Sequence, residues 1–363
     1  MQHNTNTQTS IRQLQSIRLL FIFILLAGVP GWFSCTKSNS GSNGTPILTD
    51  SVDIYIAGTG YPTAAITDFS TAEIWKNGKL TKIPNSGISN YVSGIYVSNN
   101  DVYLSGYELT GLSLFMPKYW KNGVPVTIKD TMSITTGIAV SNNDVYVIGS
   151  STDPLSSKSV ARYWKNGIGV KLSDGTRNTY ASGIFISNGE VFIVGNEDSV
   201  MKLWVNGANR NISSAPVIGY ATSIYVTGND VYIAGNEYDQ SHTKLFATYW
   251  KNGNAVALSS GLTYSTANSI VVSGNDVYTA GLESVSAPGA WAARYWKNTN
   301  QINLTDGASQ LGIANAIAVE GKNVYVAGSE GGVGRYWLNG KAVNLAVGGG
   351  GGDGIYGIAI SKR

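Results

Sequence analysis

Short apolar runs alternate with polar turn sequences over residues 51–363, and each apolar run has the length of a β-strand. One series reads DIYIAG at Asp53–Gly58 and recurs in seven versions, the last being NVYVAG at Asn323–Gly328. A second series reads SGIYVS at Ser93–Ser98 and also recurs, ending with YGIAIS at Tyr356–Ser361. Runs of this length that are rich in Val, Ile and Tyr and bounded by Asn, Gly, Asp and Ser predict strands joined by tight turns.

A third series is the pentapeptide YWKNG, which occurs intact at Tyr119–Gly123, Tyr163–Gly167 and Tyr249–Gly253 and in four near-copies. Its tryptophans are Trp75, Trp120, Trp164, Trp204, Trp250, Trp296 and Trp337. A weaker fourth series, such as AVAL and AVNL, follows each copy. Asn-Gly between two apolar runs is a strong hairpin signal, because both residues tolerate positive φ. YWKNG is therefore interpreted as the end of a strand with its turn.

Four strands repeated seven times, with a period of roughly 45 residues, are typical of a β-propeller. We expect an all-β, seven-bladed β-propeller with four antiparallel strands per blade. Because the chain starts with a strand of the DIYIAG series and ends with YGIAIS, the C-terminal strand should pair into the first blade and close the ring. The repeated Trp is expected to pack between adjacent blades, since it has a large area to bury, and the alternative is an aromatic platform for a ligand.

The repeat resembles the YWKNG-repeat propeller lipoproteins of bacteria, and it is similar to kelch and HAF-type extracellular repeats in having a Gly-ended strand, a variable loop and an aromatic strand. The resemblance covers residues 51–363. The paired glycines of kelch strands and the Trp-Asp mark of WD repeats are missing. The resemblance implies the fold and export from the cytoplasm, and it implies no particular ligand.

The N-terminus has the composition of an export signal. Arg12 and Arg18 precede an apolar run of about 15 residues, Leu19–Phe33, which is shorter than a bilayer-spanning helix. Residues 1–34 are thus expected to be a lipoprotein-like signal peptide, with lipidation of Cys35, and residues 35–50 to be a flexible linker. The predicted location is the cell envelope, as an outer-membrane lipoprotein facing the periplasm or the surface. Plain secretion and an uncleaved anchor are the alternatives.

Composition removes several functional classes. The formal charge is +3 with no basic cluster, so nucleic acid is not an expected partner. A single cysteine and two histidines do not supply a disulfide framework or a multi-histidine zinc site, so no metal or cofactor is expected. No partner chain is predicted, and a monomer is expected.

Antiparallel strand order sets two faces, one with the short turns and one with the longer, varied loops, where function tends to lie. On this variable-loop face, a Gly-x-Glu pattern places a glutamate in each of five repeats, and a basic residue begins the adjacent strand in most of them. Structural ion pairs are the favoured interpretation over a ligand-binding carboxylate ring or a solvated surface. The glutamates are Glu108, Glu197, Glu237, Glu283 and Glu330, and the basic residues are Lys118, Lys202, Arg294 and Arg335.

Aromatic residues are the second candidate on that face, because Tyr and Trp combine an apolar ring with a polar group that can grip peptides or sugars. Four of these aromatic residues are expected in long loops, and three are expected around the mouth of the central channel; they are given in that order. They are Tyr61, Tyr107, Tyr238 and Trp291, with Tyr91, Tyr180 and Tyr220. The alternative is that these rings pack loop against loop.

The sequence therefore predicts a lipid-anchored binding module that presents its variable-loop face to a protein, peptide or glycan. No catalytic residue is predicted. An extracytoplasmic hydrolase or lyase acting on carbohydrate is the second hypothesis, and it requires two carboxylates from different blades at the channel mouth. A purely structural envelope protein is the third.

Overall fold

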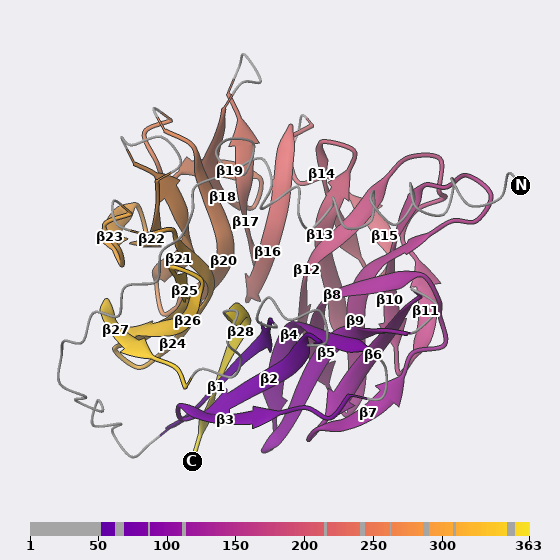
Figure 1. Ribbon diagram of the computed structural model, residues 1–363. Coiled ribbons are helices and arrows are strands. Elements are labelled where there is room, and N and C mark those ends of the chain that lie inside the picture. Colours follow the sequence, from indigo (N-terminus) through magenta and orange to yellow (C-terminus); the bar gives the residue numbers. More distant parts are fainter. Residues whose placement is uncertain are drawn as a thin grey trace, which may run out of the picture. The chain divides into compact units, whose positions relative to one another are not determined.

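The computed structural model describes residues 52–61, 69–85, 88–110, 114–213, 216–239, 244–261, 263–285, 290–307, 310–346 and 353–363. They fall in one compact unit, Pro46–Ser286 with Ala290–Arg363. The expected signal peptide, linker and Cys35 lie outside the described residues. The described part is a seven-bladed β-propeller in which every blade is a four-stranded antiparallel sheet (Figure 1).

The strands fall into four groups, from the axis outward. The inner strands are β4 (Ser89–Ser98), β8 (Ser133–Ser141), β12 (Thr179–Ser187), β16 (Gly219–Thr227), β20 (Ser265–Ser273), β24 (Gly312–Glu320) and β28 (Asp353–Lys362). The second strands are β1 (Val52–Gly60), β5 (Asp101–Leu109), β9 (Asp144–Thr152), β13 (Glu190–Glu197), β17 (Asp230–Tyr238), β21 (Asp276–Ser284) and β25 (Asn323–Glu330).

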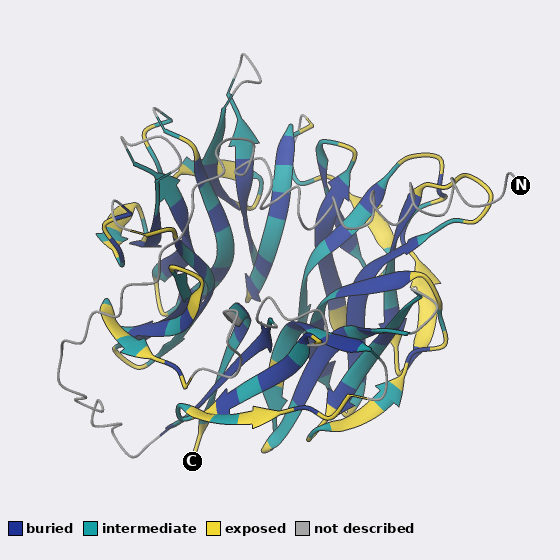
Figure 2. Ribbon diagram, in the orientation of Figure 1, coloured by how far each residue is buried: buried dark blue, intermediate teal, exposed yellow. Residues whose placement is uncertain are grey.

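The third strands are β2 (Thr71–Lys76), β6 (Phe115–Lys121), β10 (Ser159–Lys165), β14 (Val200–Val205), β18 (Leu245–Lys251), β22 (Trp291–Lys297) and β26 (Val333–Leu338). The outer strands are β3 (Lys79–Lys82), β7 (Val124–Thr127), β11 (Ile168–Lys171), β15 (Ala208–Arg210), β19 (Asn254–Ala257), β23 (Asn300–Asn303) and β27 (Lys341–Asn344). Burial decreases toward the outer strands (Figure 2).

Blade 1 contains both ends of the described chain, and blades 2 to 7 follow in order from β4–β7 to β24–β27. The C-terminal strand β28 pairs antiparallel with β1, from Val52 opposite Lys362 to Gly60 opposite Asp353. In Figure 1 the yellow β28 accordingly lies beside the indigo β1. The predicted closure by the C-terminal strand is confirmed, and β1 has a paired strand on its inner side.

The seven tryptophans form the core between the blades. Seven clusters of buried side chains occur, each combining residues of two adjacent blades, and each contains one of these tryptophans. Trp164 of blade 3, for example, packs with Tyr103 and Ile128 of blade 2. All seven are at most 3% exposed, so the inter-blade interpretation is confirmed over the ligand platform.

The rest of the pentapeptide fixes the turn and ties the third strand to the second. Asn122 has φ of 51° and Gly123 of 80°, the positive values that a two-residue hairpin turn needs. The Asn122 side chain accepts a hydrogen bond from the Val102 backbone N–H at 2.9 Å and donates one to Asp101 at 2.7 Å. Lys121 pairs with Asp101 at 2.7 Å and lies over the ring of Tyr103.

This turn network repeats around the ring. An Asn side chain accepts the backbone bond in every blade, and Lys–Asp pairs with Lys over Tyr occur in five. The pentapeptide recurs because its Trp and Asn have the same structural task in every blade, and its Lys has the same task in five. These Asp and Lys residues therefore belong to the turns, where the Asp carboxylate interacts with both the Lys and the Asn side chain.

Every inner strand carries a β-bulge next to the glycine that ends the DVYxAG run. At Gly106 a Cβ would lie 1.9 Å from the carbonyl oxygen of Tyr91, and the equivalent glycine of each blade meets an inner-strand carbonyl in the same way. The bulged residues are Ser93, Thr136, Ser182, Thr222, Asn268, Asn315 and Tyr356. The glycines are thus required by close backbone approach.

Candidate functional site

Around the channel, the bulged side chains link one blade to the next. Thr136 donates to the carbonyl of Ala181 at 2.7 Å, and Ser182 donates to that of Ala221 at 2.6 Å. The same hydrogen bond to a carbonyl of the next blade is made by Thr222 to Ala267, by Asn268 to Ala314 and by Asn315 to Ile355. Ser93 instead forms a hydrogen bond with the hydroxyl of Thr135. The channel wall is therefore a polar ring whose hydrogen bonds join the blades, a feature that the strand pattern alone did not reveal.

Blade 1 departs from this ring because Tyr356 stands where the other blades have a short Ser, Thr or Asn. Its hydroxyl oxygen lies 2.5 Å from that of Tyr61, which follows β1. Both rings also crowd Gly354, whose Cβ would contact them at about 3 Å. Tyr61 is thus held beside the closing strand, at the end of blade 1 that faces the variable loops.

The carboxylates of the Gly-x-Glu pattern lie at the variable-loop end of the second strands, and four of them are paired within their own blade. Lys118 pairs with Glu108, and Lys202 lies 2.7 Å from Glu197. Arg335 lies 2.7 Å from Glu330, and Arg294 lies 3.5 Å from Glu283. Each basic residue is opposite the strand glycine, so its side chain can extend over that glycine to the acid. The expected structural ion pairs are confirmed for these four blades.

Two blades compensate for a missing member of the pair. In blade 1, Gly60 stands at the glutamate position and Glu73 at the basic position, and the buried Glu73 carboxylate pairs with Lys82 at 3.7 Å. In blade 3, Arg162 donates to the hydroxyl of Ser151 at 2.5 Å and pairs with Asp130 at 3.6 Å.

Blade 5 is different. Glu237 keeps the acid position, but Thr248 takes the basic position opposite Gly235, and Phe246 is directly opposite Glu237. No hydrogen bond or ion pair reaches the Glu237 carboxylate from the residues that the structure describes. The Thr248 hydroxyl is buried and also has no hydrogen-bond partner among them. Burial raises the pKa of Glu237 above its ordinary value.

The seven candidate aromatic residues are mostly strand residues, which corrects the expectation for three of them. Tyr107 lies within β5, Tyr238 is the last residue of β17 and Trp291 is the first of β22, whereas Tyr61 follows β1. The strands continue past their apolar runs because backbone pairing continues, as between Leu109 and Phe115. Tyr91, Tyr180 and Tyr220 belong to the variable-loop ends of the inner strands β4, β12 and β16.

These tyrosines gather in two places. In blade 2, Tyr91 stacks on Tyr107 with ring centroids 5.0 Å apart, and Phe115 meets Tyr107 edge-on at 5.5 Å. In blade 5, the rings of Tyr220 and Tyr238 are 6.0 Å apart and their hydroxyls 3.5 Å apart. Burial raises the pKa of Tyr238 to about 12, and burial also raises the pKa of Tyr180 in blade 4. Whether these rings grip a ligand stays a prediction.

Large apolar side chains are exposed mainly on the variable-loop face. Leu155 at the β9–β10 loop is 96% exposed. Four more exposed apolar residues lie in loops of this face, namely Phe69, Met132, Tyr264 and Leu311, and Val333 begins β26 there. Four further exposed apolar residues lie elsewhere: Val124, Ile168 and Val170 belong to outer strands, and Tyr96 belongs to the inner strand β4.

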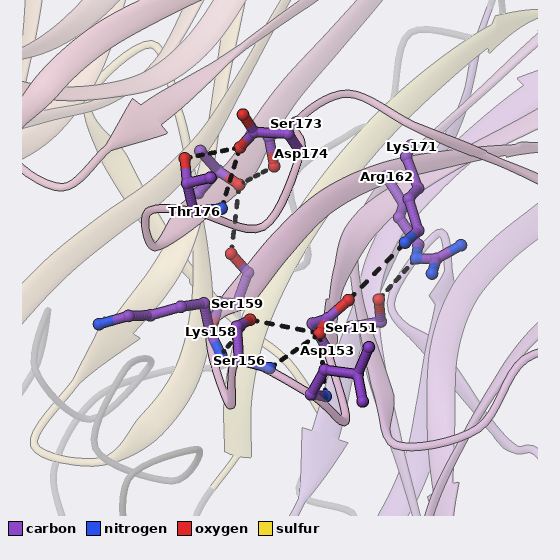
Figure 3. A network of polar contacts seen from close by, with 12 residues as sticks. Ser151, Asp153, Ser156, Lys158, Ser159, Arg162, Lys171, Ser173, Asp174 and Thr176 are labelled. Carbon is purple, nitrogen blue, oxygen red and sulfur yellow. Dashed lines mark hydrogen bonds and ion pairs between the residues drawn. The ribbon is translucent and has the colours of Figure 1, made fainter.

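The loop that carries Leu155 is internally hydrogen-bonded (Figure 3). Asp153 accepts bonds from the backbone N–H groups of Leu155 and Ser156, each at 3.0 Å, and pairs with Lys171 at 3.7 Å. These bonds hold the pKa of Asp153 below its ordinary value. The turn therefore presents Leu155 outward from a fixed backbone.

A cavity of about 240 Å³ lies at the outer side of blade 4, between β14, β15 and the segment that leads to β16. Its lining includes Met201, Lys202, Arg210 and Val217. Of the two basic residues in this lining, Lys202 is paired with Glu197.

The described part of the chain lacks a metal-binding cluster and a membrane-spanning helix. No group of three or more His, Cys, Asp or Glu residues is placed there to hold a metal ion. None of its segments forms a helix with the length and apolar character needed to cross a membrane.

No family model and no curated protein matches this sequence. Solved structures with similar chain traces include a computationally designed protein, Ika8, with a TM-score of 0.44 and 17% identity over 74% of this chain and 77% of that one. The β-propeller domain of the Trilobed protease from Pyrococcus furiosus gives 0.47 and 10%, covering 71% and 84%. Acylaminoacyl peptidase from Pyrococcus horikoshii gives 0.43 and 11%, covering 72% of this chain and 48% of the peptidase. At these identities the likeness concerns the fold alone.

Proposed function

We propose that this protein is a binding module that holds a protein or peptide partner on its variable-loop face. The observation that carries the proposal is the concentration of exposed large apolar side chains, such as Leu155 and Phe69, on the loops of that face. Exposed apolar groups on one face are typical of interaction sites, because covering them releases ordered water. Tyr91, Tyr107, Tyr220 and Tyr238 add aromatic surface at the same end of the blades.

The rigid frame supports this role. Inter-blade tryptophans, paired carboxylates and the ring of channel hydrogen bonds fix the strands, so the strand ends at this face have little freedom to lose on binding. The Leu155 loop shows the same property locally, since Asp153 holds its backbone.

We further propose that the module is exported and anchored to the envelope membrane by lipid on Cys35. The charged and apolar segments before Cys35, and the polar sequence after it, support this location. Mass spectrometry of the mature protein should find an N-terminal, lipid-modified Cys35. An unmodified Cys35, or a retained residue 34, would contradict the anchor.

The binding role can be tested with peptide and glycan arrays and two matched variants. Leu155→Asp places a charge on the variable-loop face, and Ile168→Asp places one on β11, where Ile168 is 73% exposed. We expect peptides to be captured, with capture weakened by Leu155→Asp and unchanged by Ile168→Asp. Capture of glycans alone, or equal loss in both variants, would contradict a peptide-binding variable-loop face.

A further inference from the structure

Blade 5 differs from its neighbours by one missing cation. In blades 2, 4, 6 and 7 a Lys or Arg extends over the strand glycine and neutralises the glutamate at the variable-loop end. In blade 5 the corresponding residue is Thr248, whose short side chain is uncharged. The two polar groups left behind, the Glu237 carboxylate and the Thr248 hydroxyl, have no hydrogen-bond partner among the described residues.

The blade retains the carboxylate at an energetic disadvantage. Glu237 is partly buried, and removing a carboxylate from water without a partner destabilises the folded state. Blades 1 and 3, which also lack one member of the pair, have a replacement nearby: Lys82 of β3 in blade 1, and Asp130 of the β7–β8 connection for blade 3. Blade 5 does not do so within the described residues.

The surroundings of this position suit an alkyl chain that ends in a cation. Phe246 is opposite Glu237 in the strand pair, and the Met201 methyl of blade 4 would lie 3.0 Å from a Cβ on Gly235. Tyr238 follows Glu237 directly and contacts Tyr220. In blades 2, 4, 6 and 7 the residue opposite the glutamate is likewise apolar, and there the glutamate pairs with a Lys or Arg whose alkyl stem can lie along apolar surface.

We propose that blade 5 binds a Lys or Arg side chain of the peptide partner, and that its ammonium or guanidinium group occupies the place of the missing intramolecular cation beside Glu237. This assignment rests on the proposed binding function and adds the chemical class that it recognises. A peptide is favoured over an amino sugar because Lys or Arg side chains neutralise the corresponding glutamate in four other blades.

The test is an NMR titration of the full protein with defined probes. The probes are the capped peptides Gly-Gly-Lys-Gly-Gly and Gly-Gly-Arg-Gly-Gly, the same peptide with acetyl-lysine, and a glucosamine tetramer. The variants are Glu237→Gln, which removes the charge, and Thr248→Lys, which supplies the missing partner. Glu330→Gln is the matched control, because Glu330 has the same blade position but is already paired with Arg335.

We expect the Lys or Arg peptide to bind the wild type and to bind at least about tenfold more weakly to both blade 5 variants, since a charged hydrogen bond is lost in each. Acetylation of the lysine should have the same effect, and Glu330→Gln should change nothing. If Thr248→Lys does not fold, Glu237→Gln alone decides the result.

Three outcomes would overturn the assignment: no binding of either cationic peptide, equal loss in the Glu330→Gln control, or binding of the glucosamine tetramer alone. If array peptides still bind through the Leu155 loop while Glu237→Gln has no effect, the binding function stands and the cation site is wrong. If no peptide binds in either experiment, both proposals fail.

Discussion

Replacing one inter-blade tryptophan tests how the ring is held together. Trp120 and Trp164 are both fully buried between blades, but their indole N–H groups differ. The N–H of Trp164 donates to Asp130 at 3.1 Å, whereas that of Trp120 has no partner among the described residues. Substitution of each by Phe keeps an aromatic ring and removes the N–H, so the pair separates packing from hydrogen bonding.

The expected magnitudes follow from this geometry. A buried Trp→Ala change costs about 3–5 kcal/mol, a large part of the ~5–15 kcal/mol by which proteins are stable. Trp164→Phe should cost more than Trp120→Phe by about 1.5–3 kcal/mol, because a hydrogen bond to a carboxylate is lost and Asp130 loses a donor. Trp120→Phe removes a buried N–H group that has no hydrogen-bond partner among the described residues, and the free energy recovered in this way offsets part of the packing lost with the larger ring.

Urea unfolding followed by far-UV circular dichroism measures these differences as shifts in midpoint at constant slope. Phe69→Ala is the control, because Phe69 is exposed and its loss should change the unfolding free energy by no more than about 0.5 kcal/mol. An equal cost for the two Trp→Phe variants, or a larger one for Trp120→Phe, would show that the N–H contact does not contribute as the structure indicates.

Three further predictions concern closure, the bulge and pH. Deleting residues 353–363 removes β28 and leaves β1 without its inner partner, so cooperative thermal unfolding should be lost at temperatures where the intact chain is folded; an unchanged melting curve would refute closure by this strand. Gly106→Ala should destabilise the fold by several kcal/mol, since its Cβ would lie 1.9 Å from a carbonyl oxygen, and Gly123→Ala provides a comparison in which only the positive φ of 80° is strained. Because the folded-state pKa of Glu237 is raised, its contribution to stability is complete below the unfolded pKa and decreases as pH rises through the folded pKa. Glu237→Gln should therefore melt at a higher temperature than the wild type at pH 7 and at the same temperature at pH 3.5, and a lower melting temperature at pH 7 would contradict the unpaired carboxylate.

Much of this fold could be predicted because its information is local and repeated. Val, Ile and Tyr runs, Asn-Gly turns and a Trp at fixed spacing recur in every blade, so the strand order, the blade count and closure by Tyr356–Ser361 followed without tertiary information. The ion pairs could also be predicted, since Gly-x-Glu and the basic residue flank the same strand connection. The interruption at Thr248 was visible in the same alignment of repeats, but no local rule says whether another residue replaces the missing cation.

The sequence by itself determined the units, their number and their chemistry, because the hydrogen bonds of a hairpin join residues that are close in the chain. Only the tertiary structure decided which groups meet across blades: that Thr136 reaches Ala181, that Tyr61 meets Tyr356, and that Glu237 finds no cation in the described part of blades 4 and 5. Such contacts join residues about 40 to 295 positions apart. They depend on the bulge that recurs in each inner strand and on the radial packing of complete sheets, and this packing is not encoded in any single repeat.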